Sequence, residues 1–295
     1  MEVCKLCPRR CGIDRSTARG FCNSPAVPVV ARAALHFWEE PCISGDRGSG
    51  TVFFSGCTLR CVYCQNREIS RGKAGKQITV ERLEEIFFEL KDKGAHNINL
   101  VTPDHFAVPI VQAVRRARNR GLDLPIVMNT GGYVSDETYD LLKQAADIWL
   151  TDFKYSDSAL SAKYSGAPDY PEVAAHALER MVEDTGSPVY DADGMMQKGV
   201  IVRILLLPGQ VEDAENTVRQ IWDKYGDRVV LSLMDQYTPP SGGLEGFPEL
   251  ERTVTDEEYD ALCDLALDLG IEEAYVQEGG TQSESFIPPF DLEGV

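Results

Sequence analysis

The stretch TVFFSGCTLRCVYCQN, residues 51–66, joins a short apolar run to three closely spaced cysteines. The run Thr51–Ser55 has the length and composition of a buried β-strand. Cys57, Cys61 and Cys64 follow it with the spacing C-x₃-C-x₂-C. The chain therefore places three thiols in the loop directly after its first long apolar strand.

Five further apolar runs follow, separated by segments long enough for helices. The six runs are Thr51–Ser55, Ile98–Val101, Pro125–Met128, Ile148–Phe153, Val200–Leu207 and Val229–Met234. Most show no polar alternation, which is typical of parallel strands covered on both faces. The segments between them are amphipathic, with helix-capping residues at Thr79, Ser135 and Thr255. This alternation predicts an α/β fold, either a barrel or a doubly wound sheet. Six strands rather than eight favour an open, partial (β/α)₆ barrel of the TIM type.

The first 48 residues do not join this pattern. They carry Cys4, Cys7, Cys11 and Cys22, which make a complete metal site by ligand count. Zinc and a second iron–sulfur cluster both fit, and four free thiols are the alternative. The spacing matches no standard ferredoxin run, which slightly favours structural zinc. We expect a Cys-rich metal-binding segment at 1–48, a barrel at 49–240, and a C-terminal helix with a closing segment at 241–295.

The composition excludes several classes of protein. The 295 residues include 29 Lys and Arg against 47 Asp and Glu, a net charge of −18, which argues against nucleic-acid binding. No apolar run approaches the roughly 18 residues of a membrane span, so no membrane association is expected. Residues 1–10 contain no apolar signal segment, so we expect a cytoplasmic protein. In that reducing compartment, nine cysteines indicate metal ligands or catalysts more than disulfides.

The cysteine triad suits an iron–sulfur cluster. Three thiolates hold three irons of a 4Fe–4S cubane and leave the fourth iron open to a substrate or cofactor. Electrons delivered through such a cluster can drive reductive bond cleavage. A tetrahedral zinc site needs a fourth ligand, for which Cys42 or a distant histidine is the alternative. The remaining alternative is that the three cysteines are packed side chains that bind no metal. Cys42 and Cys263 otherwise read as packed or surface thiols.

Cys57-Thr-Leu-Arg-Cys61-Val-Tyr63-Cys64-Gln-Asn resembles the signature of the radical S-adenosylmethionine superfamily, and Tyr63 supports this match. Within that superfamily it is similar to the pyruvate formate-lyase activating enzymes and relatives of unassigned substrate. The resemblance spans residues 49–240 and implies a partial (β/α)₆ barrel. It also implies a site-differentiated 4Fe–4S cluster that chelates S-adenosylmethionine. One electron then releases methionine and a 5′-deoxyadenosyl radical, which abstracts hydrogen from a substrate.

Two strand ends extend the resemblance. The segment starting Asn129-Thr130 resembles Asp-Thr-Asn-Gly of the activating enzymes, and Asp152-Phe-Lys154 resembles their Asp-x-Lys. These positions imply contacts near the cofactor, including a monovalent cation, although Asn129 replaces the family's first acid. Arg203 resembles a basic position that contacts the cofactor. The alternatives are a surface ion pair for Asp152 and Lys154, and a salt bridge at the barrel mouth for Arg203.

The second strand departs from the family. Where the superfamily has Gly-Gly-Glu, this chain has Asn-Leu-Val-Thr102-Pro103-Asp104-His105, so Thr102 and the backbone near Pro103 would meet the methionine amino group. Asp104 and His105 are candidate substrate or acid–base groups, although a cap of the following helix is the favoured role of Asp104. The candidate cofactor-binding residues are Tyr63, Thr102, Asn129, Thr130, Asp152, Lys154, Arg203 and Gln236; the candidate catalytic residues are Asp104, His105 and Lys154.

The leading hypothesis is a radical enzyme that cleaves S-adenosylmethionine. In one version it installs a glycyl radical on a partner protein. In the other its substrate is a small molecule or peptide. The N-terminal cysteines are unlike the short activating enzymes, which weakens the first version. The resemblance also implies a flavodoxin- or ferredoxin-type electron donor. A non-catalytic iron–sulfur or metal carrier module is the hypothesis from another class.

Overall fold

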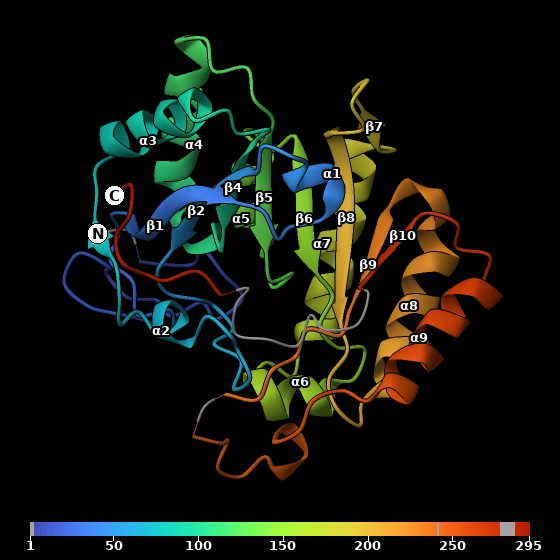
Figure 1. Ribbon diagram of the computed structural model, residues 1–295. Helices are drawn as coiled ribbons and strands as arrows, with labels where there is room; N and C mark the ends of the chain where they lie inside the picture. The colour runs from blue at the N-terminus through green and yellow to red at the C-terminus, as the bar shows by residue number, and fades with distance from the viewer. Residues whose placement is uncertain (1–2, 241, 278–286) are drawn as a thin grey trace.

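The structure is a computed structural model that describes residues 3–240, 242–277 and 287–295 (Figure 1). Its strands are β1 Val29–His36, β2 Ser49–Phe54, β3 Lys76–Gln77, β4 Ile98–Val101, β5 Ile126–Thr130, β6 Ile148–Asp152, β7 Val189–Tyr190, β8 Met196–Leu205, β9 Val230–Met234 and β10 Ala274–Val276. Its α-helices are α1 Pro41–Ser44, α2 Arg67–Ser70, α3 Val80–Asp92, α4 Ala107–Asn119, α5 Asp136–Leu142, α6 Ser158–Ser165, α7 Tyr170–Thr185, α8 Val211–Tyr225 and α9 Asp256–Asp268.

One mostly parallel sheet forms the centre of the fold. Its order is β10-β9-β8-β6-β5-β4-β2-β1-β3, with β7 paired to β8. The six strands expected from the sequence are β2, β4, β5, β6, β8 and β9, and they pair in parallel as predicted. The sheet ends at β3 on one side and β10 on the other, so it is not closed. This confirms the α/β fold and the open, partial barrel. Because the strands are parallel, their carboxyl ends meet at one edge.

The expected helix starts are also confirmed. The hydroxyl of Thr79 accepts a hydrogen bond from the backbone N–H of Arg82 at 3.1 Å, and Ser135 caps α5 in the same way. Thr255 and Glu258 form the reciprocal capping box of α9. The long helices pack around the sheet, α3 against α4 and α8 against α9 (Figure 1). No helix in the described ranges is both long and apolar enough to cross a membrane.

The N-terminal segment contributes one strand to the sheet. Val29–His36 forms β1, which pairs antiparallel with β2. The last residues of the chain run beside it, since the N–H of Ala33 donates to the carbonyl of Glu293 at 2.8 Å (Figure 1). Residues before β1 form a coil that packs near α2, where the Asn23 side chain donates to the carbonyl of Arg71 at 3.1 Å. The Cys-rich coil is therefore placed next to the carboxyl-end edge of the barrel.

Candidate active site

A cavity of about 240 Å³ lies at the edge where the parallel strands end. It is lined by every residue that the sequence analysis singles out for cofactor binding: Tyr63, Thr102, Asn129, Thr130, Asp152, Lys154, Arg203 and Gln236. Cys57, Cys61, Cys64 and Asp104 line the same cavity. Six different strand ends thus converge on one space, as the parallel topology requires. His105 is the one candidate that does not line it.

The cysteine triad occupies a loop held by local hydrogen bonds. The backbone N–H of Leu59 lies 3.4 Å from the sulfur of Cys57, and the hydroxyl of Ser165 donates to the sulfur of Cys61 at 3.0 Å. Burial, with a smaller contribution from the neighbouring Cys61, raises the pKa of Cys57 to about 12. Burial and Cys61 likewise raise the pKa of Cys64. The loop therefore presents three apposed, desolvated thiols that a positively charged metal centre would stabilise as thiolates.

The donor set of this loop fits an iron–sulfur cluster. Its thiols are soft ligands, and in a cubane each cysteine binds a different iron. Ligands of one metal ion would instead have to converge on a single point. In the described part of the chain, no three Cys, His, Asp or Glu side chains are grouped around such a point. Cys42 packs in a separate core cluster with Val127 and Ile148, so it does not complete a zinc site with the triad.

Tyr63 anchors the loop between the second and third cysteines of the triad. Its ring makes edge contacts with the rings of Tyr155, Tyr164 and Tyr237, with centroids 6.2 to 6.4 Å apart. Its hydroxyl accepts a hydrogen bond from Tyr155 at 2.9 Å, and Tyr155 in turn contacts the hydroxyl of Ser165 at 2.7 Å. This aromatic cluster packs the triad loop against α6.

The end of β4 departs from expectation in two places. Asp104 does not cap a helix: it lies inside a short 3₁₀ turn, and its carboxylate accepts a hydrogen bond from Thr130 at 2.8 Å. Burial raises the pKa of Asp104 to about 6, which keeps it available for proton transfer. His105 instead faces the backbone, with Nε2 3.0 Å from the carbonyl of Ser55. Thr102 adopts φ 60°, a strained value for a β-branched residue, at the cavity wall.

Asp152 and Lys154 form an ion pair at the end of β6. The Nζ of Lys154 lies 2.6 Å from Oδ2 of Asp152, and both residues line the cavity. The hydroxyl of Tyr170 accepts from the N–H of Lys154 at 2.9 Å and donates to the carbonyl of Gly131 at 3.0 Å. A surface ion pair was the alternative for Asp152 and Lys154. The pair instead lies at the cavity, where Tyr170 joins the ends of β5 and β6.

Arg203 is held by two acids that the sequence analysis missed. Its guanidinium binds Glu40 through two hydrogen bonds of 2.7 and 2.6 Å and also pairs with Glu39. Burial alone would raise the pKa of Glu40, but the charge and hydrogen bonds of Arg203 lower it. Asn99 donates to the carboxylate of Glu39 at 2.9 Å. Arg203 thus forms the salt bridge that was the alternative to a cofactor contact, and its side chain also lines the cavity. The one sequence signal was the acidic pair directly before Pro41.

The four N-terminal cysteines lie close together. Burial, with smaller contributions from the nearby Cys22, Cys11 and Cys4, raises the pKa of Cys7 to about 12. The N–H of Phe21 lies 3.4 Å from the sulfur of Cys11. Their thiols share one small region without being grouped as the ligands of a single ion. Zinc and a second cluster both remain predictions for this site.

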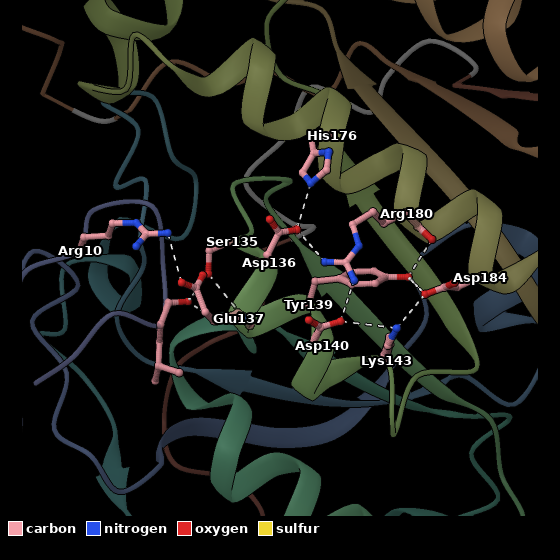
Figure 2. Close-up of polar contacts among 12 residues, drawn as sticks. Arg10, Ser135, Asp136, Glu137, Tyr139, Asp140, Lys143, His176, Arg180 and Asp184 are labelled. Carbon is pink, nitrogen blue, oxygen red and sulfur yellow. Dashed lines mark hydrogen bonds and ion pairs between the residues drawn. The ribbon is translucent and has the colours of Figure 1, made fainter. Parts of the chain in front are cut away.

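The N-terminal coil is also attached to the barrel helices. The carbonyl of Leu6 accepts hydrogen bonds from the hydroxyls of Ser135 and Thr138 at the start of α5. Figure 2 shows Arg10 reaching Glu137 in the same helix turn, at 3.2 Å. Ion pairs from Arg180 to Asp136 and Asp140 join α5 to α7 in the same view, each at 2.6 Å. The N-terminal coil therefore contacts a part of the barrel in which ion pairs hold two helices together.

Residues 51–221 match the sequence profile of the Radical SAM superfamily. The match covers more than half of the chain and contains the triad and the ends of β2, β4, β5, β6 and β8 that line the cavity, whereas Gln236 after β9 lies beyond it. This chain belongs to the radical SAM superfamily. Membership supports radical chemistry driven by cleavage of S-adenosylmethionine, and it implies a 4Fe–4S cluster together with that cofactor.

Individual relatives are distant. The uncharacterized protein MJ0674 of Methanocaldococcus jannaschii is 27% identical over 89% of this chain and 74% of its own length. The pyruvate formate-lyase 1-activating enzyme of Escherichia coli (strain K12) is 23% identical over 65% of this chain and 74% of that enzyme. Streptococcus suis SuiB bound to precursor peptide SuiA matches with a TM-score of 0.52 at 12% identity, over 76% of this chain. The match covers 47% of SuiB and shows the shared fold.

Proposed function

We propose that this protein binds S-adenosylmethionine at a 4Fe–4S cluster held by Cys57, Cys61 and Cys64, and uses it to abstract hydrogen from a substrate. When bound, these groups supply a 5′-deoxyadenosyl radical after one-electron reduction. The observation that carries the proposal is the convergence of the triad, Tyr63 and seven strand-end residues on one cavity of about 240 Å³. Such a cavity fits a cofactor that must be oriented before it reacts.

The residues around the cavity have separable roles in this proposal. Lys154, neutralised in part by Asp152 at 2.6 Å, provides a positive charge beside the triad for the carboxylate of the cofactor. Thr102 and Asn129 offer a hydroxyl, an amide and backbone groups where the family motif has an acid. Gln236, which follows β9 and lines the same cavity, is assigned the contact with the adenine or the substrate. Asp104, which also lines the cavity, is assigned the role of holding or accepting a proton.

We propose only the chemical class of the substrate. A small molecule or peptide fits a chain whose N-terminal cysteines have no counterpart in the short activating enzymes. Similarity to pyruvate formate-lyase activating enzymes supports the alternative, in which the substrate is a glycine of a partner protein. A flavodoxin- or ferredoxin-type donor would supply the electron. Reconstituted protein incubated with a candidate glycyl-radical partner decides between these versions, because only the activating version produces a glycyl-radical signal.

Cys61→Ala tests the cluster assignment. Two thiolates are too few for the cubane, so we expect loss of cluster iron and of all 5′-deoxyadenosine formation after anaerobic reconstitution with dithionite and S-adenosylmethionine. Cys263→Ala is the matched control, because Cys263 lies in α9 away from the cavity. It should keep wild-type iron content and cleavage. A Cys61→Ala protein that still forms 5′-deoxyadenosine contradicts the assignment.

The same assay separates an enzyme from a carrier. A carrier module binds its cluster but leaves S-adenosylmethionine intact. Wild-type protein with a complete cluster and no 5′-deoxyadenosine would therefore favour the carrier. Formation of 5′-deoxyadenosine that depends on both dithionite and Cys61 supports the enzyme.

A further inference from the structure

The N-terminal coil contacts the triad loop through one side chain. Arg9 lies between Cys7 and Cys11 in the sequence. Its Nε donates to the carbonyl of Thr58, inside the triad loop, at 2.9 Å. Its other nitrogens donate to the carbonyl of Ser165 at 2.8 Å and to that of Gly166. One guanidinium thus joins the N-terminal cysteine site, the triad loop and the end of α6.

The position of Arg9 is fixed on several sides. Its guanidinium stacks over the ring of Phe21 at 4.0 Å. Arg60, in the triad loop, donates from its own guanidinium to the carbonyl of Phe21 at 2.9 Å. The carbonyls that Arg9 binds at α6 are among the last of that helix, which have no partner within it and favour a positive charge. Arg9 therefore connects the coil, the triad loop and α6 through contacts on several sides of its guanidinium.

The connection ends at a cluster ligand. Ser165 is 4% exposed, and its hydroxyl lies 3.0 Å from the sulfur of Cys61. Arg9 holds the backbone of this same serine and the loop that carries Cys61. The N–H of Val62 also donates to the carbonyl of Tyr164 at 2.8 Å. The distance between α6 and the loop therefore determines whether the hydroxyl reaches the sulfur.

Hydrogen bonds to cysteine sulfurs are a main determinant of the reduction potential of iron–sulfur clusters. A donor stabilises the added negative charge of the reduced cluster, so its loss moves the potential to more negative values. We propose that Arg9 is a positioning residue which, through Ser165, sets the hydrogen bond to Cys61 and thereby the reduction potential of the triad's cluster. The N-terminal cysteine site thus acts on the radical site by holding its ligand. This inference rests on the proposed cluster at Cys57, Cys61 and Cys64.

Redox titration followed by EPR tests the inference in reconstituted full-length protein. Ser165→Ala should keep the cluster irons and shift the midpoint potential to a more negative value. Arg9→Gln should shift it in the same direction. Arg10→Gln is the matched control, because the Arg10 side chain is exposed and its ion pair is with Glu137 of α5 (Figure 2). It should match the wild type.

The double variant distinguishes positioning from direct charge. If Arg9 acts through Ser165, Arg9→Gln adds no further shift in the Ser165→Ala background. An equal shift in both backgrounds means that Arg9 acts through its charge, and this overturns the inference. Hydrogen exchange of the metal-free protein gives an independent readout, since Arg9→Gln should speed exchange across residues 57–62 and Arg10→Gln should not.

The outcomes also separate this inference from the proposed function. If the wild-type protein assembles no four-iron cluster, the proposed function fails. If every variant assembles the cluster and cleaves S-adenosylmethionine at an unchanged potential, the inference about Arg9 and Ser165 fails while the proposed function stands. Should Arg9→Gln not fold, Ser165→Ala alone still tests the hydrogen bond to Cys61.

Discussion

Gly56 and Ser24 lie so close together that a Cβ on Gly56 would sit 1.9 Å from the hydroxyl oxygen of Ser24. The carbonyl of Cys22 would be 2.6 Å away, and the φ of Gly56 is +93°. Gly56 is the residue before the first cysteine of the triad, and Cys22 is the last cysteine of the N-terminal site. The two cysteine sites therefore meet at a glycine that has no room for a side chain.

Gly56→Ala is expected to weaken both cysteine sites. The backbone conformation costs a non-glycine residue about 1–2 kcal/mol, and the added methyl group forces rigid backbone apart at a further cost of about 1–3 kcal/mol. Denaturant unfolding should show a loss of this size, together with a lower metal content in both sites. Gly94→Ala is the control: its φ is also positive, but nothing lies within 4 Å of its Cβ. Equal losses in the two variants would contradict the proposed close approach.

Arg203 should be needed for stability as well as for the cavity. Arg203→Ala leaves the side chains of Glu39 and Glu40, only 6% and 4% exposed, without their cation. Breaking a buried pair in this way costs about 3–5 kcal/mol. Adding Glu39→Gln and Glu40→Gln to Arg203→Met should recover part of the loss, because no buried charge is left unpaired. Urea unfolding measures both effects, and an Arg203→Ala variant within about 1 kcal/mol of wild type would show that the network contributes little.

Local sequence signals predicted the parallel strands and the helix starts well. The six parallel strands and the capping residues Thr79, Ser135 and Thr255 depend on short-range patterns, which the sequence displays directly. The convergence of the strand-end residues then follows from parallel topology alone. The strand Val29–His36 was missed because the cysteine-rich segment before it dominated the interpretation of the first 48 residues.

The missing parts of the site are contacts between distant segments. Glu39 and Arg203 are separated by 164 positions, and Ser165 and Cys61 by 104. Neither pair leaves a periodic or spacing signal, because its members belong to elements that meet only in the folded chain. Asp104 was misjudged for a related reason. A cap is the common role of an Asp at a helix start, but here Thr130 on the neighbouring strand donates to its carboxylate.

The capping box of α9 predicts a pH-dependent contribution to stability. Hydrogen bonds from Arg252 lower the pKa of Glu258 to about 2, with smaller contributions from the N–H groups of Thr255 and Gly209. Its ordinary value is 4.5, so the contribution is complete above that pH and is lost as the pH falls from 4.5 towards 2. Glu258→Gln should therefore lower the free energy of unfolding by about 1 kcal/mol at pH 7, and by less at pH 3.

Exposed Glu257, in the same turn, provides the control for this experiment. Glu257→Gln should change stability little at either pH. If the difference between wild type and Glu258→Gln is the same at pH 3 and pH 7, the ionised carboxylate of Glu258 is not the source of the stability.

The N-terminal cysteines are expected to hold a closed structural metal with no open coordination position. Cys7 is buried among the other three cysteines, and a Cβ on Gly20 would lie 2.8 Å from the sulfur of Cys11, so the coil is compact. Cys7→Ala should release this metal and speed hydrogen exchange across the coil before β1. Small zinc modules gain up to the order of 10 kcal/mol from their metal. Here the loss should be smaller, since Arg9 and the contacts of Leu6 also hold the coil.

Metal analysis identifies the bound species. About one zinc and four irons per chain indicate structural zinc, and about eight irons indicate a second cluster. The four irons of the triad should remain in Cys7→Ala, because their ligands come from a separate loop. Cleavage of S-adenosylmethionine should persist, while the midpoint potential moves towards that of Ser165→Ala, because Arg9 loses its anchored neighbours. A Cys7→Ala protein that keeps all its metal, or that loses the triad's irons although its barrel is folded, contradicts this division between the two sites.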